Sequence, residues 1–203
     1  SNTSSAPAMV ASDRRWAPLR RRWLRTRRPG DGWMLGMNVP RSVVRALVRS
    51  AVRPVLSTRL QPPRQRVMID LLTKVAILPK GTRSTATRLG GVPSDRIVTA
   101  ASQPDRALLY LHGGGYTVGS RTTHRAVASH LADAVGAVGH LLDYRLAPEA
   151  PYPAAVEDAL AAYQALLEHG IAPEKVVVAG DSAGGGLALA LALRAREQGV
   201  PLP

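Results

Sequence analysis

The residues best suited to chemistry surround a serine near the C-terminal end of the sequence. Ser182 is the centre of Gly180-Asp181-Ser182-Ala183-Gly184, which satisfies the G-x-S-x-G pattern. An apolar run at 176–179 is expected to be a buried strand, and the Ala/Leu-rich run after the motif is expected to be a helix. A serine on such a strand-to-helix turn lies at a helix N-terminus, where developing negative charge is stabilised. The pattern therefore predicts a nucleophilic serine.

Two other structures are compatible with a glycine-rich turn before a helix. One is an ordinary helix start with no chemical role. The other is a phosphate-binding loop, which requires a Gly-Lys-Ser/Thr sequence that does not follow here. The strand and helix on either side of the motif favour the nucleophile over both.

A second glycine-rich segment follows an expected strand at 107–111. His112-Gly113-Gly114-Gly115-Tyr116 contains three consecutive glycines, which lose much backbone freedom on folding. Such a run is expected where bare N–H groups face a ligand, and an oxyanion hole needs donors about 3 Å from the forming negative oxygen. His112 itself is either a stabiliser of the loop or a general base, and its place in the motif favours the first.

The elements around these two segments alternate between strand and helix. A hairpin is expected from strands at 85–89 and 96–100 around a turn at 90–93. The apolar patterns then predict strands at 107–111, 137–144 and 176–179, alternating with helices at 122–135, 154–169 and 183–198. This order predicts an α/β fold, with a mostly parallel sheet, helices on both faces and a site at the C-terminal strand ends.

Four segments resemble motifs of the hormone-sensitive-lipase-like family of carboxylesterases, which has the α/β-hydrolase fold. They are 112–116, 143–149 (Asp-Tyr-Arg-Leu-Ala-Pro-Glu), 152–159 and 180–186. The resemblance covers residues 40–203 in order. It implies hydrolysis of a small-molecule ester with Ser182 as the catalytic nucleophile, and it implies neither a cofactor nor a metal.

The resemblance also implies roles for residues near the serine. The oxyanion hole would be built from Gly113, Gly114, Gly115 and Ala183, with the last three as N–H donors and Gly113 shaping the loop. Structural support is expected from His112, Asp143, Arg145, Glu149 and Asp181. Three of these, Asp143, Arg145 and Glu149, are expected to form a brace through a buried ion pair or bonds to backbone. Asp181 is expected to position the turn rather than to transfer a proton.

The acid and the histidine of a catalytic triad do not follow Ser182. In this fold the triad runs in the order Ser, Asp or Glu, His, but residues 183–203 contain only one acidic residue, Glu197, and no histidine. We therefore expect both partners beyond Pro203, an incomplete catalytic domain, little activity of this chain alone, and an exposed edge at 176–179. The upstream histidines are expected on helices or a strand, away from the open side of the serine turn, as surface or packing residues: His124, His130, His140 and His169.

Composition restricts the remaining classes of function. The 203 residues are 45% hydrophobic and 20% charged, as in a soluble globular protein, and no apolar run is long enough for a transmembrane helix. The absence of cysteine excludes disulfides, Cys-ligated zinc and a thiol nucleophile. The net charge of +13 belongs to residues 1–66, where fifteen arginines face only Asp13 and Asp31. Because this region has little aromatic interleaving and no lysine, we expect GC-rich coding rather than a specific nucleic-acid partner.

Three regions are expected along the chain. Residues 1–40 form an Arg-rich disordered tail, 41–80 a helical cap with helices at 43–60 and 65–78, and 81–203 the incomplete catalytic domain. Membrane-surface attachment through a basic helix face is the alternative for the cap. A cytoplasmic location is expected, and a homo-oligomer is compatible with these features. The alternative function is a non-catalytic small-ligand-binding protein on the same scaffold, as in plant gibberellin receptors.

Overall fold

The computed structural model describes residues 40–47, 49–50, 60–73 and 77–203. The chain divides into two units, residues 1–47 and 48–203. The described part of the first unit contains one helix, α2 (Arg41–Leu47). The expected tail at 1–40 lies outside the described residues except for Pro40, and so does most of the expected helix at 43–60 beyond Leu47. All elements considered below belong to the second unit.

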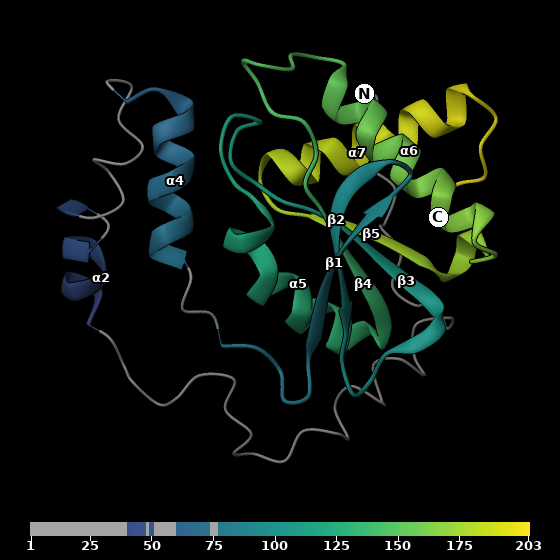
Figure 1. Cartoon of the computed structure of the whole chain (residues 1–203), viewed down its shortest axis with the longest axis horizontal. Helices are drawn as coiled ribbons and strands as arrows, with labels where there is room; N and C mark the ends of the chain where they lie inside the picture. The colour runs from purple at the N-terminus through teal and green to yellow at the C-terminus, as the bar shows by residue number, and fades with distance from the viewer. Residues whose placement is uncertain (1–39, 48, 51–59, 74–76) are drawn as a thin grey trace, which may run out of the picture. The chain divides into compact units, whose positions relative to one another are not determined.

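The second unit contains a five-stranded sheet with helices on both faces (Figure 1). In chain order its elements are α4 (Pro62–Thr73), β1 (Arg83–Leu89), β2 (Val92–Val98), β3 (Gln103–Leu111), α5 (Arg121–Val135), β4 (Ala137–Leu142), α6 (Ala154–Glu168), the 3₁₀ helix η3 (Pro173–Lys175), β5 (Val176–Gly180) and α7 (Ala183–Glu197). The strand order is β1-β2-β4-β3-β5; β4, β3 and β5 are parallel, while β1–β2 and β2–β4 are antiparallel. The expected α/β class is confirmed, but the sheet is mixed rather than mostly parallel, because two of its four strand pairs are antiparallel. β5 lies at an edge of the described sheet.

The first hairpin differs from its prediction. Leu89 pairs with Val92, so the turn consists of Gly90 and Gly91 alone, and β2 begins four residues before the expected start at 96. Both glycines have positive φ, 57° and 79°, which two-residue hairpin turns of the primed type require. The four-residue turn expected at 90–93 was wrong, because Pro93 was taken as a turn residue. Pro93 instead lies in β2 opposite Arg88, in an antiparallel pair, so its missing N–H removes no hydrogen bond between the parallel strands.

The core has one layer on each face of the sheet. Figure 1 shows α5 on one side and α6 and α7 on the other. Successive residues of β3 serve the two layers in turn: Leu109 and Leu111 pack with α6 and α7, whereas Tyr110 packs with Ile97 and Ala128 on the α5 side. This alternation fixes the register of β3 and therefore the place where its last residue delivers the glycine loop.

The helices that flank the site end at identifiable signals. The Ser120 side chain accepts hydrogen bonds from the backbone N–H groups of Thr122 and Thr123, and the left-handed Gly136 (φ 65°) ends α5. The expected helix at 65–78 is α4, which begins earlier, at Pro62, with proline at the first helical position. Residues 74–76 lie outside the described residues, and 77–80 are not helical. In the described part of the chain, no helix has the length and apolar character needed to cross a bilayer.

We expect His140, in β4, to make stability fall as the pH is lowered. Burial, with smaller contributions from Arg96 and His169, lowers the pKa of His140 from 6.5 to about 4. Between pH 6.5 and about 4, His140 is therefore protonated in the unfolded chain but neutral in the folded one. The free energy of unfolding accordingly decreases as the pH falls from about 6.5 toward 4. Between pH 7.5 and 5, His140→Gln should reduce the pH-dependent loss in urea unfolding by about 2 kcal/mol.

The control for this experiment is His169→Gln, which removes an exposed histidine of the same sheet face. That variant should retain most of the pH dependence. An unchanged pH dependence in His140→Gln would contradict the prediction.

Candidate active site

Ser182 occupies a strained turn between β5 and α7. Its φ of 49° and ψ of −119° lie in a region that non-glycine residues rarely adopt. The glycines on either side leave room for this turn: a Cβ on Gly184 would overlap the carbonyl oxygen of Leu111, and a Cβ on Gly180 would come within 2.5 Å of the same atom. The G-x-S-x-G spacing thus lets the turn pack directly against the end of β3.

The glycine loop and the serine turn leave neighbouring strands at the same edge. Leu111 pairs with Gly180 in the parallel β3–β5 ladder, so residues 112–116 begin beside residues 181–184. A hydrogen bond of 3.0 Å from the Gly113 N–H to Asp181 Oδ1 joins them directly. The Gly113 N–H is thereby occupied, which agrees with a loop-shaping role and not with that of an oxyanion donor. No hydrogen bond in the described part of the chain occupies the N–H groups of Gly114, Gly115 or Ala183.

Asp181 connects the turn to three other elements. Besides the Gly113 N–H, its Oδ1 accepts a hydrogen bond of 2.9 Å from the Tyr110 hydroxyl, and burial together with this bond raises the pKa of Tyr110. The Nε2 of His124, on α5, lies 3.5 Å from the same oxygen. The first turn of α5 thus brings His124 against the residue that precedes Ser182, a contact that the sequence analysis did not predict.

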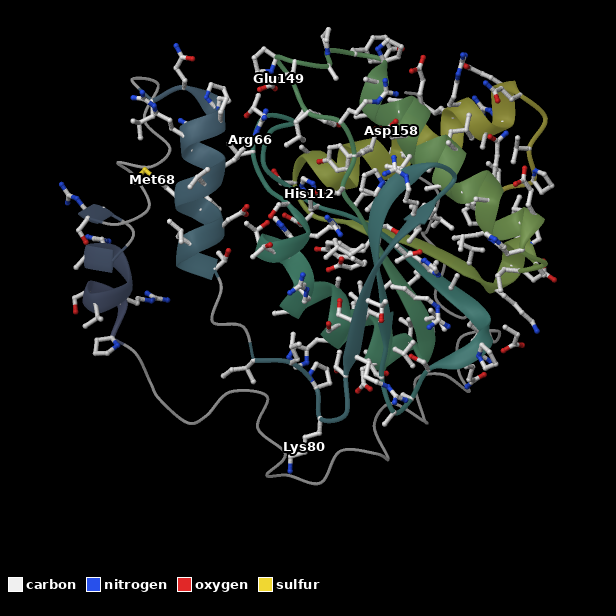
Figure 2. All side chains as sticks on the ribbon, in the orientation of Figure 1. Arg66, Met68, Lys80, His112, Glu149 and Asp158 are labelled. Carbon is white, nitrogen blue, oxygen red and sulfur yellow. The ribbon has the colours of Figure 1, made fainter. Side chains whose placement is uncertain are left out.

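His112 is fully buried behind the glycine loop (Figure 2). Its ring stacks on Tyr144, with centroids 4.3 Å apart, and on His124, at 5.4 Å. Its Nδ1 bonds to the carbonyl oxygen of Gly113 at 2.8 Å, and the Tyr144 hydroxyl donates to the carbonyl oxygen of His112 at 2.6 Å. Burial is the main cause that lowers the pKa of His112. These contacts hold the carbonyl groups of the first two loop residues, His112 and Gly113, in line with the stabilising role that we favour over a general base.

The expected brace of Asp143, Arg145 and Glu149 consists of three separate pairings. Asp143 Oδ2 accepts a bond of 3.1 Å from Arg121 Nε on α5. Arg145 bonds bidentately to Asp158 on α6 through its Nε and Nη2, and its backbone N–H donates to the same carboxylate. Glu149 receives two bonds from Arg66 on α4. The three residues therefore attach the loop after β4 to three helices and do not pair with one another.

Arg66 is a site residue that the sequence analysis missed. Figure 2 shows it reaching from α4 toward the loop that carries Glu149. Its guanidinium also donates to the carbonyl oxygens of Thr117 and Ala147, both at 2.8 Å. Thr117 directly follows the glycine loop, so a single side chain of α4 joins this loop to the loop that carries Glu149. One arginine among many in this region carried no signal in the sequence.

The Arg145–Asp158 pairing is expected to stabilise the fold measurably. The Asp158 side chain is only 9% exposed and accepts bonds from both the backbone and the guanidinium of Arg145. Asp158→Ala leaves these donors without their acceptor and should lower the free energy of unfolding by about 1.5 kcal/mol. Urea unfolding monitored by circular dichroism measures this change.

Its neighbour provides a matched control. Glu157 touches Arg145 Nη2 at 3.3 Å, with both side chains more than half exposed. Glu157→Ala should therefore change stability by less than about 0.5 kcal/mol. Equal effects of the two variants would show that the pairing with Asp158 is not what holds the loop.

The described residues show no metal centre: no group of three or more His, Cys, Asp or Glu side chains among them is arranged to hold an ion. The chemistry available at this edge of the sheet is that of a serine on a strained turn and of free backbone N–H donors at a helix N-terminus. Buried aromatic rings and the partly exposed Asp181 carboxylate support them.

Comparison with known proteins places this geometry in a family. A model of the alpha/beta hydrolase fold matches residues 108–203. An acetyl-hydrolase of Streptomyces hygroscopicus is 51% identical over 56% of this chain and 41% of its own length. The esterase LipI of Mycobacterium tuberculosis is 37% identical over 82% of this chain and 47% of its own length. A solved esterase from the bacterial hormone-sensitive lipase family has a TM-score of 0.73 at 38% identity, over 81% of this chain and 56% of that one.

The fold and the serine turn together define the chain as part of an α/β hydrolase. Within that fold its relatives are esterases of the hormone-sensitive-lipase-like family, the family whose motifs the four sequence segments resemble. The chain spans about half the length of the curated relatives that it matches.

Proposed function

We propose that the protein containing this chain hydrolyses short acyl or aryl esters through an acyl-enzyme intermediate on Ser182. The observation that carries the proposal is the strained Ser182 turn, joined to the glycine loop by the Asp181–Gly113 hydrogen bond. This bond supports a fixed spacing between the nucleophile and the N–H groups of Gly114, Gly115 and Ala183. Fixed donors stabilise the tetrahedral oxyanion because they need not reorganise during the reaction.

In the proposed reaction the Ser182 Oγ attacks the ester carbonyl and loses its proton to a histidine base. The base then protonates the leaving alcohol, and water releases the acid from the acyl-enzyme by the reverse sequence. His124 is a poor candidate for the base, because its Nε2 faces Asp181 and its Nδ1 lies 2.6 Å from Thr123 Oγ1. We infer that the base and its acid partner come from polypeptide outside these 203 residues, since residues 183–203 contain no histidine.

Covalent labelling tests the proposal. A fluorophosphonate probe added to the full-length protein should modify Ser182, identified by mass spectrometry of the peptide, and excess ester substrate should slow the labelling. Absence of labelling in a folded protein that still binds ester analogues would instead favour the alternative, a non-catalytic small-ligand-binding protein.

A further inference from the structure

A cavity lies under the C-terminal end of α6, on the sheet face opposite α5. Its volume is about 350 Å³, and it is built from β1, β2, the N-terminal halves of β3 and β4, and the residues that follow α6. None of the residues that the active site uses lines it. Its polar lining is basic and contains no acidic side chain: Arg88, Arg96, Arg106, His140 and His169.

The arginines of this cavity lack the carboxylate partners found elsewhere in the described residues. On the α5 face, Arg121 and Arg125 share the buried carboxylate of Asp95. Within the described part of the chain, no ion pair engages Arg96 or Arg106, and the nearby Asp105 pairs with Lys175 instead. Arg88 donates its Nε to the carbonyl oxygen of Gly91 at 2.9 Å, which orients its guanidinium and leaves its two amino groups for a ligand.

His140 gives independent evidence that these groups converge. Its Nδ1 is buried and has no hydrogen-bond partner among the described residues. Both Arg96 and His169 act electrostatically on its ring, although they come from β2 and from the end of α6. Side chains from three elements thus converge at this cavity: Arg96 carries a permanent positive charge, and the buried His140 ring nitrogen lacks a hydrogen bond, which costs free energy.

The remainder of the lining is apolar. It consists of Leu89, Ala107, Val138, Leu166 and Ile171, with Pro104 and the Thr87 side chain at the margin. Most of these side chains are already buried, and the apolar surface still open to a ligand comes from the half-buried Ile171 and from the aliphatic parts of the arginines. A ligand with a compact apolar body would cover it, whereas an inorganic ion would not. We propose that the cavity binds a small organic oxyanion, a phosphomonoester or carboxylate whose anionic group meets Arg96 and Arg106 and whose apolar body rests on the sheet.

Histidine NMR of the full 203-residue chain tests this site directly. Phenyl phosphate should shift the ring signals of His140 and His169 in a saturable way and leave those of His124 and His130 unchanged. Inorganic phosphate and phenol, which each carry half of the recognised chemistry, should bind more weakly. Benzoate distinguishes a general oxyanion site, where it also binds, from one selective for phosphate. The local readout separates this cavity from the arginines of residues 1–66.

The variant Arg96→Gln/Arg106→Gln should weaken phenyl phosphate binding about tenfold or more, because it removes two charge-assisted contacts. Arg83→Gln, which removes an exposed arginine of β1 outside the lining, is the matched control and should retain the affinity. The proposal is wrong if millimolar phenyl phosphate leaves both histidine signals unchanged, if phosphate alone binds as tightly, or if the double variant and the control behave alike.

Discussion

Replacing Ser182 with alanine is expected to lower kcat for a short ester such as p-nitrophenyl acetate by about 10⁵-fold or more in the full-length protein. The strained turn and the N–H groups of Gly114, Gly115 and Ala183 would remain. They stabilise an oxyanion only if a nucleophile creates one, so the loss should fall on kcat with little change in substrate binding. Steady-state kinetics of the purified variant measures both quantities.

Ser129→Ala is the matched control for this experiment. Ser129 is a fully buried serine of α5 whose Oγ has no hydrogen-bond partner among the described residues, so its removal should leave kcat unchanged. A Ser182→Ala variant that keeps a rate within about tenfold of the parent would place the nucleophile elsewhere. The proposed acyl-enzyme mechanism would then be abandoned.

The serine turn could be predicted from the sequence because the residues that determine its conformation lie close together in the chain. The apolar run at 176–179, the glycines at fixed offsets and the following helix all lie within twenty-five residues. Gly180 and Gly184 are required because the Ser182 turn packs against the carbonyl group at the end of β3, where a Cβ at either position would clash. The alternation of strands and helices was visible for the same reason, because pleat and helix periodicities are properties of short segments.

The contacts that position the turn were not visible, because they join residues distant in sequence. Arg66 meets Glu149 across 83 positions, and Tyr110 meets Asp181 across 71. The contact of His124 with Asp181 was missed for the same reason: the helix of His124 was predicted, but not that the first turn of α5 lies beside Asp181. The clustering of Asp143, Arg145 and Glu149 in one short segment predicted a brace but not its partners, which lie on three different helices.

Gly184→Ala is expected to destabilise the protein by about 3 kcal/mol or more, the largest effect on stability that we predict. Gly184 is the last residue of the motif and lies in the first turn of α7. A Cβ there would overlap the carbonyl oxygen of Leu111 and would come within 2.7 Å of the carbonyl oxygen of His112. Both are backbone atoms, which no side-chain rotation can move. The end of β3, or the start of α7, must therefore shift, and with it the Asp181–Gly113 bond.

Gly185→Ala is the matched control, since it makes the same substitution at the next residue but is not expected to reduce stability. A Cβ on Gly185 would come no closer than 3.4 Å to the carbonyl oxygen of Gly180, close to ordinary contact. Because alanine favours a helix over glycine by about 1 kcal/mol, Gly185→Ala should be neutral or stabilising. Thermal unfolding of both variants tests the contrast. If the two substitutions had equal effects on stability, the close approach of α7 to β3 would not be the reason for glycine at position 184.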